Sequence, residues 1–279
     1  LGDVYKRQLL TDPEELLNIL RLDISKKPPS LSALIQFPLK VPRPFVDAME
    51  RENWNDPLLL QVWPSKEEEM TPSSFSTDPL QEYKFNPVAG LLHKYQARVL
   101  LTVAPHCAVH CRYCFRRHFD YESNTPSRKD WGDTLDYIKN DQTIKEVILS
   151  GGDPLGISDR QLLWLIRELE SIDHLDILRI HSRIPIVLPQ RITPELITIF
   201  DQTRFDVVMV VHCNHSQEIS ENVKNALMTI QRSSVTLLNQ SVILAGINDD
   251  AKILKELSHT LFSHGALPCL LYTSDAADE

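Results

Sequence analysis

Three cysteines lie within eight residues of the sequence, in the stretch APHCAVHCRYCFRRHF. Cys107, Cys111 and Cys114 have the spacing C-x3-C-x2-C. Three thiolates on one short loop can bind a soft metal centre. A structural zinc site or a fully ligated iron–sulfur cluster takes four protein ligands, whereas this loop offers three cysteines. A four-iron cluster bound by three cysteines keeps one iron open to a substrate or cofactor.

Two other interpretations of these cysteines stay open. The same stretch contains His106, His110 and His118, which could complete a zinc site, as could Cys213 with its neighbouring histidines. The thiols could also be reduced structural cysteines. A disulfide framework is not favoured, because the first residues show no secretory signal pattern.

A glycine-rich loop follows the apolar run KEVILS. The loop reads SGGDP, and three of the eight glycines in the chain lie between residues 151 and 156. Adjacent glycines at the carboxyl end of a strand allow the backbone to approach a ligand closely. The motif alone is a weak signal, because an ordinary turn between a strand and a helix has the same composition.

Basic residues surround the cysteines, namely Arg112, Arg116 and Arg117 beside them and Lys94 and Arg98 ahead of them. The whole chain is acidic, with 29 Lys and Arg against 38 Asp and Glu, a formal net charge of −9. The positive charge is therefore local, and no stripe of aromatic and basic residues supports direct nucleic-acid binding. It either balances the thiolates or binds small anions, for which the planar fork of arginine is suited.

From Tyr95 onward, apolar runs of strand length alternate with amphipathic runs of helix length. Strands are predicted over Arg98–Val103, Glu146–Leu149, Ile177–Ile180, Asp206–Val211, Thr236–Leu244 and from Ala266–Leu267. Helices are predicted over Ser127–Asn140, Ser158–Ser171, Thr193–Asp201, Gln217–Gln231 and Asp249–His264. Repeated strand–helix units predict a parallel α/β barrel or doubly wound sheet. In such barrels chemistry occurs at the carboxyl ends of strands, which is where both loops begin.

The rest of the chain has a different composition. Residues 9–92 are rich in proline and predict an irregular extension with short helices over Pro13–Leu22, capped by Thr11 or Asp12, and Pro44–Glu50. Trp63–Pro87 is polar and predicts a surface segment. Residues 1–8 and 269–279 fit no element and are interpreted as adapter sequence on a truncated chain, which leaves a core domain over 93–268. No apolar run reaches about 18 residues, so no membrane span is expected.

Longer stretches carry a family resemblance: HKYQARVLLTVAPHCAVHCRYCFRRHF, VILSGGDPL, LRIHSRIPIVLPQRIT and VTLLNQSVILAGIND. Together they resemble the radical S-adenosylmethionine lysine 2,3-aminomutases. FSTDPLQE, VAGLLHKYQ and CFRRHF further resemble the bacterial branch that makes (R)-β-lysine for elongation factor P. The resemblance spans about Leu10 to Pro268. It implies a partial parallel (β/α)6 barrel and a cytoplasmic isomerase that moves the amino group of L-lysine from C2 to C3. Its cofactors would be a [4Fe–4S] cluster, S-adenosylmethionine and pyridoxal phosphate, with a flavodoxin- or ferredoxin-like reductant.

The resemblance also implies roles for individual residues. The cluster would be bound by Cys107, Cys111 and Cys114, and S-adenosylmethionine by Tyr113, Ser150, Gly151, Gly152 and Asp153. Pyridoxal phosphate would contact Lys94, Tyr95, Arg98 and Gln240. Lys94 replaces an arginine of some relatives and supplies charge without the fork. The substrate would be bound by Arg116 at its carboxylate and by Asp249 at its distal ammonium. A helix N-cap is the alternative for Asp249, and His181 and Gln190 either line the site or are buried polar residues.

One expected residue is missing. In the family, the lysine that binds pyridoxal phosphate covalently lies near the C-terminus, and no residue of this sequence matches it. We therefore expect the full-length gene product, and not the chain as written, to be the active enzyme. Two alternatives remain: another radical aminomutase, acting on free lysine or glutamate, and a non-catalytic zinc-binding module.

Overall fold

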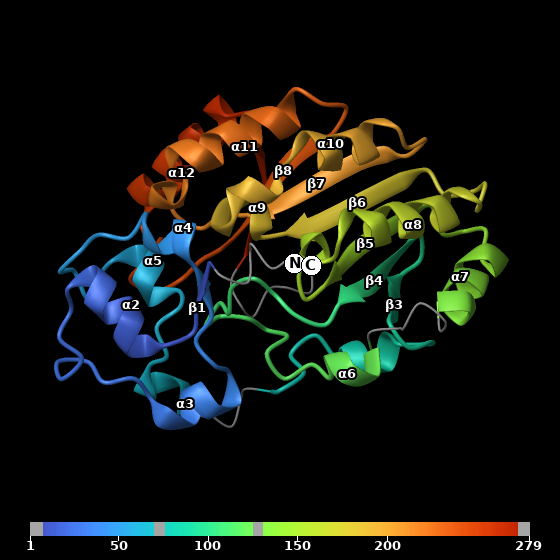
Figure 1. Cartoon of the computed structure of the whole chain (residues 1–279). Coiled ribbons are helices and arrows are strands. Elements are labelled where there is room, and N and C mark those ends of the chain that lie inside the picture. Colours follow the sequence, from blue (N-terminus) through green and yellow to red (C-terminus); the bar gives the residue numbers. More distant parts are fainter. Residues whose placement is uncertain (1–7, 70–75, 125–130, 273–279) are drawn as a thin grey trace.

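The computed structural model describes residues 8–69, 76–124 and 131–272 (Figure 1). Its centre is a seven-stranded sheet with the strands in chain order. The strands are β3 (Leu91–Tyr95), β4 (Arg98–Ala104), β5 (Glu146–Gly151), β6 (Ile177–Ser182), β7 (Asp206–His212), β8 (Thr236–Val242) and β9 (Leu267–Tyr272). All neighbours from β4 to β9 pair in parallel. The order never reverses, as it would in a doubly wound sheet, so the predicted partial barrel is confirmed.

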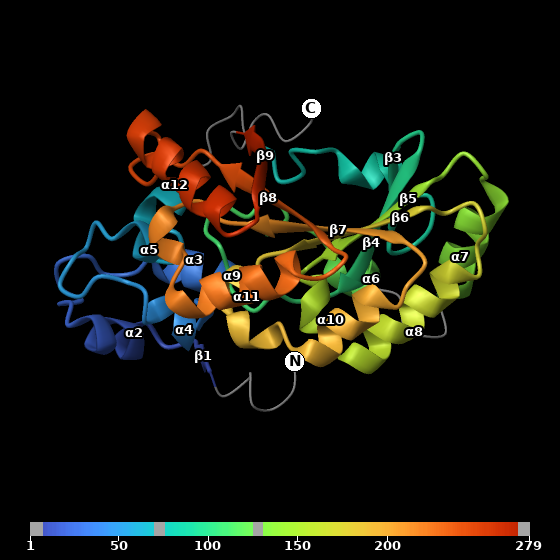
Figure 2. The same ribbon diagram turned by 90° about the horizontal axis from the view of Figure 1, so that it is seen from above.

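The helices between the strands cover the sheet. They are α7 (Trp131–Asn140), α8 (Asp159–Glu170), α10 (Pro194–Asp201), α11 (Glu221–Gln231) and α12 (Ala251–Ser263). Figure 2 shows α8, α10 and α11 side by side along one face of the strands. Local signals place the starts of α8 and α10 as predicted, whereas α11 begins four residues after the predicted Gln217. Ser158 caps α8 through a capping box with Gln161, and Thr193 accepts a hydrogen bond from the Leu196 N–H at the start of α10.

Shorter elements complete the connections. They are α6 (Tyr121–Asn124), η3 (Pro154–Gly156), α9 (Ile184–Val187), η4 (Pro189–Arg191) and η5 (Ser216–Glu218). The N-terminal extension contains β1 (Leu9–Leu10), α2 (Pro13–Leu20), α3 (Leu31–Gln36), β2 (Val41–Pro42), α4 (Arg43–Val46), α5 (Pro57–Leu60), η1 (Lys66–Glu69) and η2 (Glu82–Phe85). Asp12, one of the two predicted caps, accepts a hydrogen bond from the Glu14 N–H at 2.9 Å. No helix among the described residues is long and apolar enough to cross a membrane.

Three features of the fold differ from the sequence predictions. β3 pairs antiparallel with β4, so the sheet begins within the stretch assigned to the extension. The last strand runs through residues 269–272 and pairs with β8, although these residues were interpreted as adapter sequence. The rest of the suspected adapter stretches, 1–7 and 273–279, lies outside the described residues. Finally, the polar segment from Trp63 onward is not only surface, because Trp63 and Glu82 are buried.

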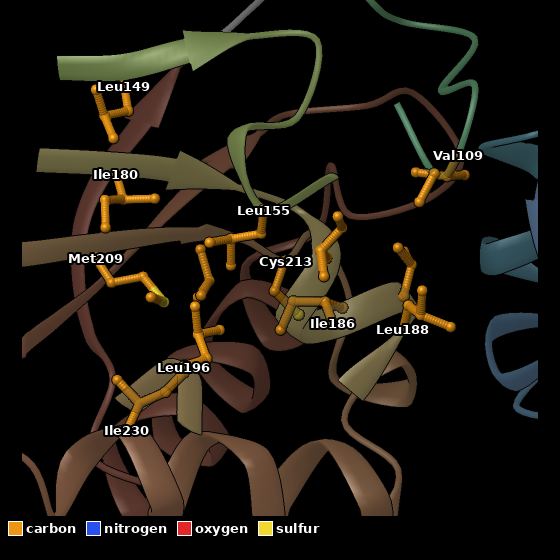
Figure 3. Packing of buried hydrophobic residues seen from close by; sticks show 14 of the residues in the cluster. Val109, Leu149, Leu155, Ile180, Ile186, Leu188, Leu196, Met209, Cys213 and Ile230 are labelled. Atoms are coloured by element: carbon orange, nitrogen blue, oxygen red, sulfur yellow. The ribbon is translucent and has the colours of Figure 1, made fainter. Parts of the chain in front are cut away.

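The hydrophobic core lies between the sheet and its helices and continues under the cysteine loop. Figure 3 shows Leu149, Ile180 and Met209 on neighbouring strands, with Leu196 of α10 and Ile230 of α11 opposite them. All five are fully buried. Val109, from the cysteine loop, is 3% exposed and belongs to the same cluster. The loop is therefore anchored by the core, against which Cys111 also packs.

Candidate active site

A single cavity collects most of the predicted site residues at the carboxyl ends of the strands. Its volume is about 350 Å³. The predicted residues that line it are Cys107, Cys111, Cys114, Tyr113, Ser150, Gly151, Gly152, Asp153, Lys94, Tyr95, Arg98, Gln240, Arg116 and His181. Leu92, Val99, Leu100 and Ile148 supply apolar wall. Asp249 and Gln190 are not part of the lining.

The three thiols of the cysteine loop share one electrostatic environment. Burial raises the pKa of each, and for Cys114 it does so to about 11, with the charge of Cys111 adding to the effect. Three thiolates this close repel one another, and an iron centre offsets that repulsion. Within the described part of the chain, no group of three or more His, Cys, Asp or Glu side chains is arranged to hold a single metal ion. A donor set of three thiols on one loop suits an iron–sulfur cluster with one iron left open.

Each cysteine has a cation that acts against the rise in its pKa. Lys40 of the extension does so for Cys107, and Arg183, at the end of β6, does so for Cys111. For Cys114, Arg116 and Arg117 lower the pKa. Part of the local positive charge noted in the sequence therefore balances the thiolates.

Two of the arginines near the cysteines bind the extension and do not line the cavity. Arg112 Nε donates to Glu68 Oε1 at 2.8 Å, and Arg117 Nη1 donates to Glu68 Oε2 at 2.7 Å. Both guanidinium groups lie over the Phe37 ring, 5.2 and 5.1 Å from its centre. Burial raises the pKa of Glu68, but the hydrogen bonds from the two arginines outweigh burial and lower it. These arginines clamp the cysteine loop in place.

The glycines of the SGGDP loop are required by contact between two loops. A Cβ on Gly152 would overlap the backbone of His106, with its C and N atoms only 2.6 and 2.7 Å away. Gly151 has φ +105°, and its Cβ would lie 2.9 Å from Thr102 Cα. The Gly152 N–H donates to Ala104 O at 2.8 Å. The sequence interpretation assigned these glycines to ligand approach. In the structure Gly151 adjoins strand β4, and Gly152 adjoins His106 of the cysteine loop.

Asp153 is buried and fully hydrogen-bonded at the end of the same loop. Its Oδ1 accepts from Ser182 Oγ at 2.7 Å, and its Oδ2 accepts from the backbone N–H groups of Arg183 and Ile184 at 2.8 and 3.1 Å. Burial raises the pKa of Asp153, and these hydrogen bonds oppose the rise. The carboxylate therefore ties the end of β5 to the end of β6.

Tyr113 anchors a buried network that the sequence analysis did not find. Its hydroxyl accepts hydrogen bonds from Arg183 Nη1 and, at 2.7 Å, from Asn214 Nδ2. Arg183 Nη2 also donates to Gln61 Oε1 at 2.7 Å and to Glu218 Oε2 at 3.3 Å. The only sequence signal was position, because Arg183 and Asn214 each follow a predicted strand. The network connects the cysteine loop to the extension and to two strand ends.

Two cations line the cavity at the hairpin of β3 and β4. Lys94 and Arg98 place two cations on the cavity wall, and the Arg98 guanidinium lies 5.1 Å from the centre of the Tyr95 ring.

His181 and His212, on neighbouring strands, have ring centres 5.6 Å apart and line the same cavity. Burial lowers the pKa of both, to about 4 for His212, so both imidazoles are neutral at pH 7.

Arg116 forms a buried ion pair with Glu82, a residue that the sequence analysis did not single out. Arg116 Nε donates to Glu82 Oε1 and Oε2 at 3.1 and 2.9 Å, and Nη2 donates to Oε1 at 2.5 Å. Arg116 Nη1 donates to Ser150 Oγ at 3.0 Å. Burial by itself lowers the pKa of Arg116, but the charge and hydrogen bonds of Glu82, together with the charges of Tyr121 and Cys114, outweigh burial and raise it.

Asp249 is exposed and lies away from the cavity lining. Its Oδ1 accepts a hydrogen bond from the Gly246 N–H at 2.9 Å. The alternative role as a helix cap is wrong, because Asp250 caps α12 and accepts hydrogen bonds from the N–H groups of Lys252 and Ile253.

The sequence matches known proteins over most of its length. Residues 101–211, which run from β4 to β7 and include the cysteine loop and the SGGDP loop, match the radical SAM superfamily. The chain is 49% identical over 269 residues to the L-lysine 2,3-aminomutase of Haemophilus influenzae, covering 96% of this chain and 80% of that protein. It is 46% identical over 268 residues to the L-lysine 2,3-aminomutase of Escherichia coli, covering 96% and 78%. The chain belongs to the L-lysine 2,3-aminomutase family, whose members are isomerases.

Proposed function

We propose that this protein converts L-lysine to (R)-β-lysine in the cytoplasm and that this product serves the modification of elongation factor P. The observation that carries the proposal is the cavity, where the three thiols, the SGGDP loop, the cationic hairpin and Arg116 meet. The names of the similar proteins support L-lysine as the substrate. The stretches FSTDPLQE, VAGLLHKYQ and CFRRHF support the link to elongation factor P.

The residues present suit the cluster, S-adenosylmethionine and the phosphate group of pyridoxal phosphate. Cys107, Cys111 and Cys114 would hold the cluster, and Tyr113 with Ser150, Gly151, Gly152 and Asp153 would adjoin S-adenosylmethionine. Lys94 and Arg98 would bind the phosphate of pyridoxal phosphate, beside Tyr95 and Gln240. When bound, the cluster and S-adenosylmethionine supply a carbon radical that takes a hydrogen atom from the substrate, and pyridoxal phosphate activates the migrating amino group.

The protein's own residues bind, orient and shield the substrate. Arg116 binds its carboxylate through charge-assisted hydrogen bonds. The role predicted for Asp249 at the distal ammonium needs a contact that the cavity lining does not include. The apolar wall around Leu100 and Ile148 excludes water, which would quench a radical. Because His181 and His212 stay neutral, they add polar contacts without adding charge.

The electron comes from a flavodoxin- or ferredoxin-like protein. All five cysteines are free thiols in the structure, which suits a reducing compartment. Neither a membrane nor a nucleic acid is needed as a partner.

A product assay tests the proposal. Full-length protein is incubated anaerobically with reductant, S-adenosylmethionine, pyridoxal phosphate and L-lysine, and the product is resolved by chiral chromatography. We expect (R)-β-lysine from L-lysine and no β-glutamate from L-glutamate in a parallel reaction. Formation of β-glutamate alone would favour the other aminomutase. Colourless protein with zinc in place of about four irons per chain would contradict both.

A further inference from the structure

We propose that Glu82 is a positioning residue that fixes the Arg116 guanidinium for the carboxylate of an amino acid substrate. The inference rests on the proposed function, because it takes Arg116 to be the residue that binds this carboxylate. Glu82 belongs to η2 in the N-terminal extension, 34 residues before its partner and outside the radical SAM match.

The pair is built for orientation. Glu82 and Arg116 are each 8% exposed, and both line the cavity. The carboxylate contacts one edge of the guanidinium, the edge formed by Nε and Nη2. Such a two-point contact prevents the planar group from rotating, which a single hydrogen bond would not do.

The remaining donors then face in a fixed direction. A guanidinium carries five N–H groups. Glu82 takes the single one on Nε and one on Nη2, and Ser150 Oγ takes one on Nη1. One N–H is left on each terminal nitrogen, and two such donors on one fixed guanidinium can serve the two oxygens of a carboxylate. Among the described residues, no other hydrogen bond uses them.

Glu82 is itself held in place. Its backbone N–H donates to Asp78 Oδ1 at 2.9 Å, and the Gln81 N–H donates to Asp78 O at 3.2 Å. Gln81 has φ 53°, in the left-handed region, which turns the chain into η2. The side chain therefore reaches Arg116 from a turn with its own internal hydrogen bonds.

Substrate binding separates positioning from a purely structural role. We would measure the affinity for L-lysine and for L-lysinamide, which lacks the carboxylate, by calorimetry on anaerobic protein loaded with its cofactors and without reductant, so that no turnover occurs. In Glu82→Gln the Kd of L-lysine is expected to rise about 10- to 100-fold. The Kd of L-lysinamide is expected to change less than about threefold, because the lost orientation matters only for a carboxylate.

A matched control is Glu146→Gln. Glu146, the first residue of β5, is 9% exposed and pairs with Arg179. Neither residue lines the cavity. Glu146→Gln should leave both Kd values unchanged. Glu82→Asp, which keeps the charge, should recover most of the L-lysine affinity and covers the case in which Glu82→Gln does not fold.

The outcomes are distinct. Wild-type protein that binds L-lysine and L-lysinamide equally would contradict the assignment of Arg116 in the proposed function. Wild-type protein that prefers L-lysine, with Glu82→Gln showing the same preference, would overturn the positioning role alone. Tighter binding of L-lysine to Glu82→Gln would also overturn it, since Glu82 would then be a competitor for Arg116.

Discussion

Gly152→Ala is expected to destabilise the protein and to impair cluster binding, because the added methyl group would overlap the backbone of His106. The new Cβ would lie 2.6 Å from the His106 carbonyl carbon, against an ordinary contact of about 3.5 Å. The two loops must therefore separate by about 1 Å. Separation weakens the hydrogen bonds from the Gly152 N–H to Ala104 O and from the Asp153 N–H to His106 O, each worth about 1 kcal/mol. With about 2 kcal/mol of overpacking strain, the total loss is about 4 kcal/mol.

The loss is measured as the free energy of unfolding of the cluster-free protein in urea, together with iron content after reconstitution. His106 directly precedes Cys107, so we expect iron binding to fall with stability. Gly132→Ala is the control, because its Cβ would meet nothing within 4 Å in helix α7. It should stabilise the protein by about 0.5–1 kcal/mol. A Gly152→Ala protein with normal iron content and stability within about 0.5 kcal/mol of wild type would refute the steric argument.

Three further changes test other parts of the site. Glu68→Gln leaves Arg112 and Arg117 without their shared carboxylate. It should lower the free energy of unfolding, measured in urea, by about 3 kcal/mol. An unchanged free energy of unfolding would show that the clamp is dispensable. His212 has a folded pKa of about 4, below the unfolded value, so its contribution is present above pH 6.5 and is lost as the pH falls toward 4. Stability should drop by up to about 1.4 kcal/mol per pH unit in that window, and less steeply in His212→Gln, as read from urea unfolding at each pH. Arg98→Gln removes a cavity cation and should raise the Kd of pyridoxal phosphate about 10-fold in an absorbance titration, whereas an equal Kd would remove it from the phosphate site.

Much of the sheet could be predicted because its strands are buried and apolar and its helices carry local caps. Ser158 and the strand Asp206–His212 are examples, since neighbouring residues alone determine them. The cysteine loop and the SGGDP loop were also found, because their spacing is local. β3 was missed since it pairs antiparallel outside the strand–helix repeat, in a stretch whose proline content argued for irregular chain.

Partners distant in sequence could not be predicted. Glu82 reaches Arg116 across 34 residues, and Arg183 reaches Gln61 across 122. No periodicity or motif records such a pair, because each side chain alone looks like an ordinary surface residue. Prediction from sequence is also limited at short range, as Asp249 and Asp250 show. The two adjacent aspartates fit a helix cap equally well, and only the backbone geometry selects Asp250.

The clamp that Glu68 makes on the cysteine loop has a consequence for how the molecule opens. Glu68, Gln61 and Glu82 all belong to the extension, and each bonds to the loop or to the strand ends beside it. Neither side can detach without exposing buried charges on both, so extension and loop form one cooperative unit. Hydrogen exchange of their amides should therefore slow together when iron is bound, although the iron contacts only the loop.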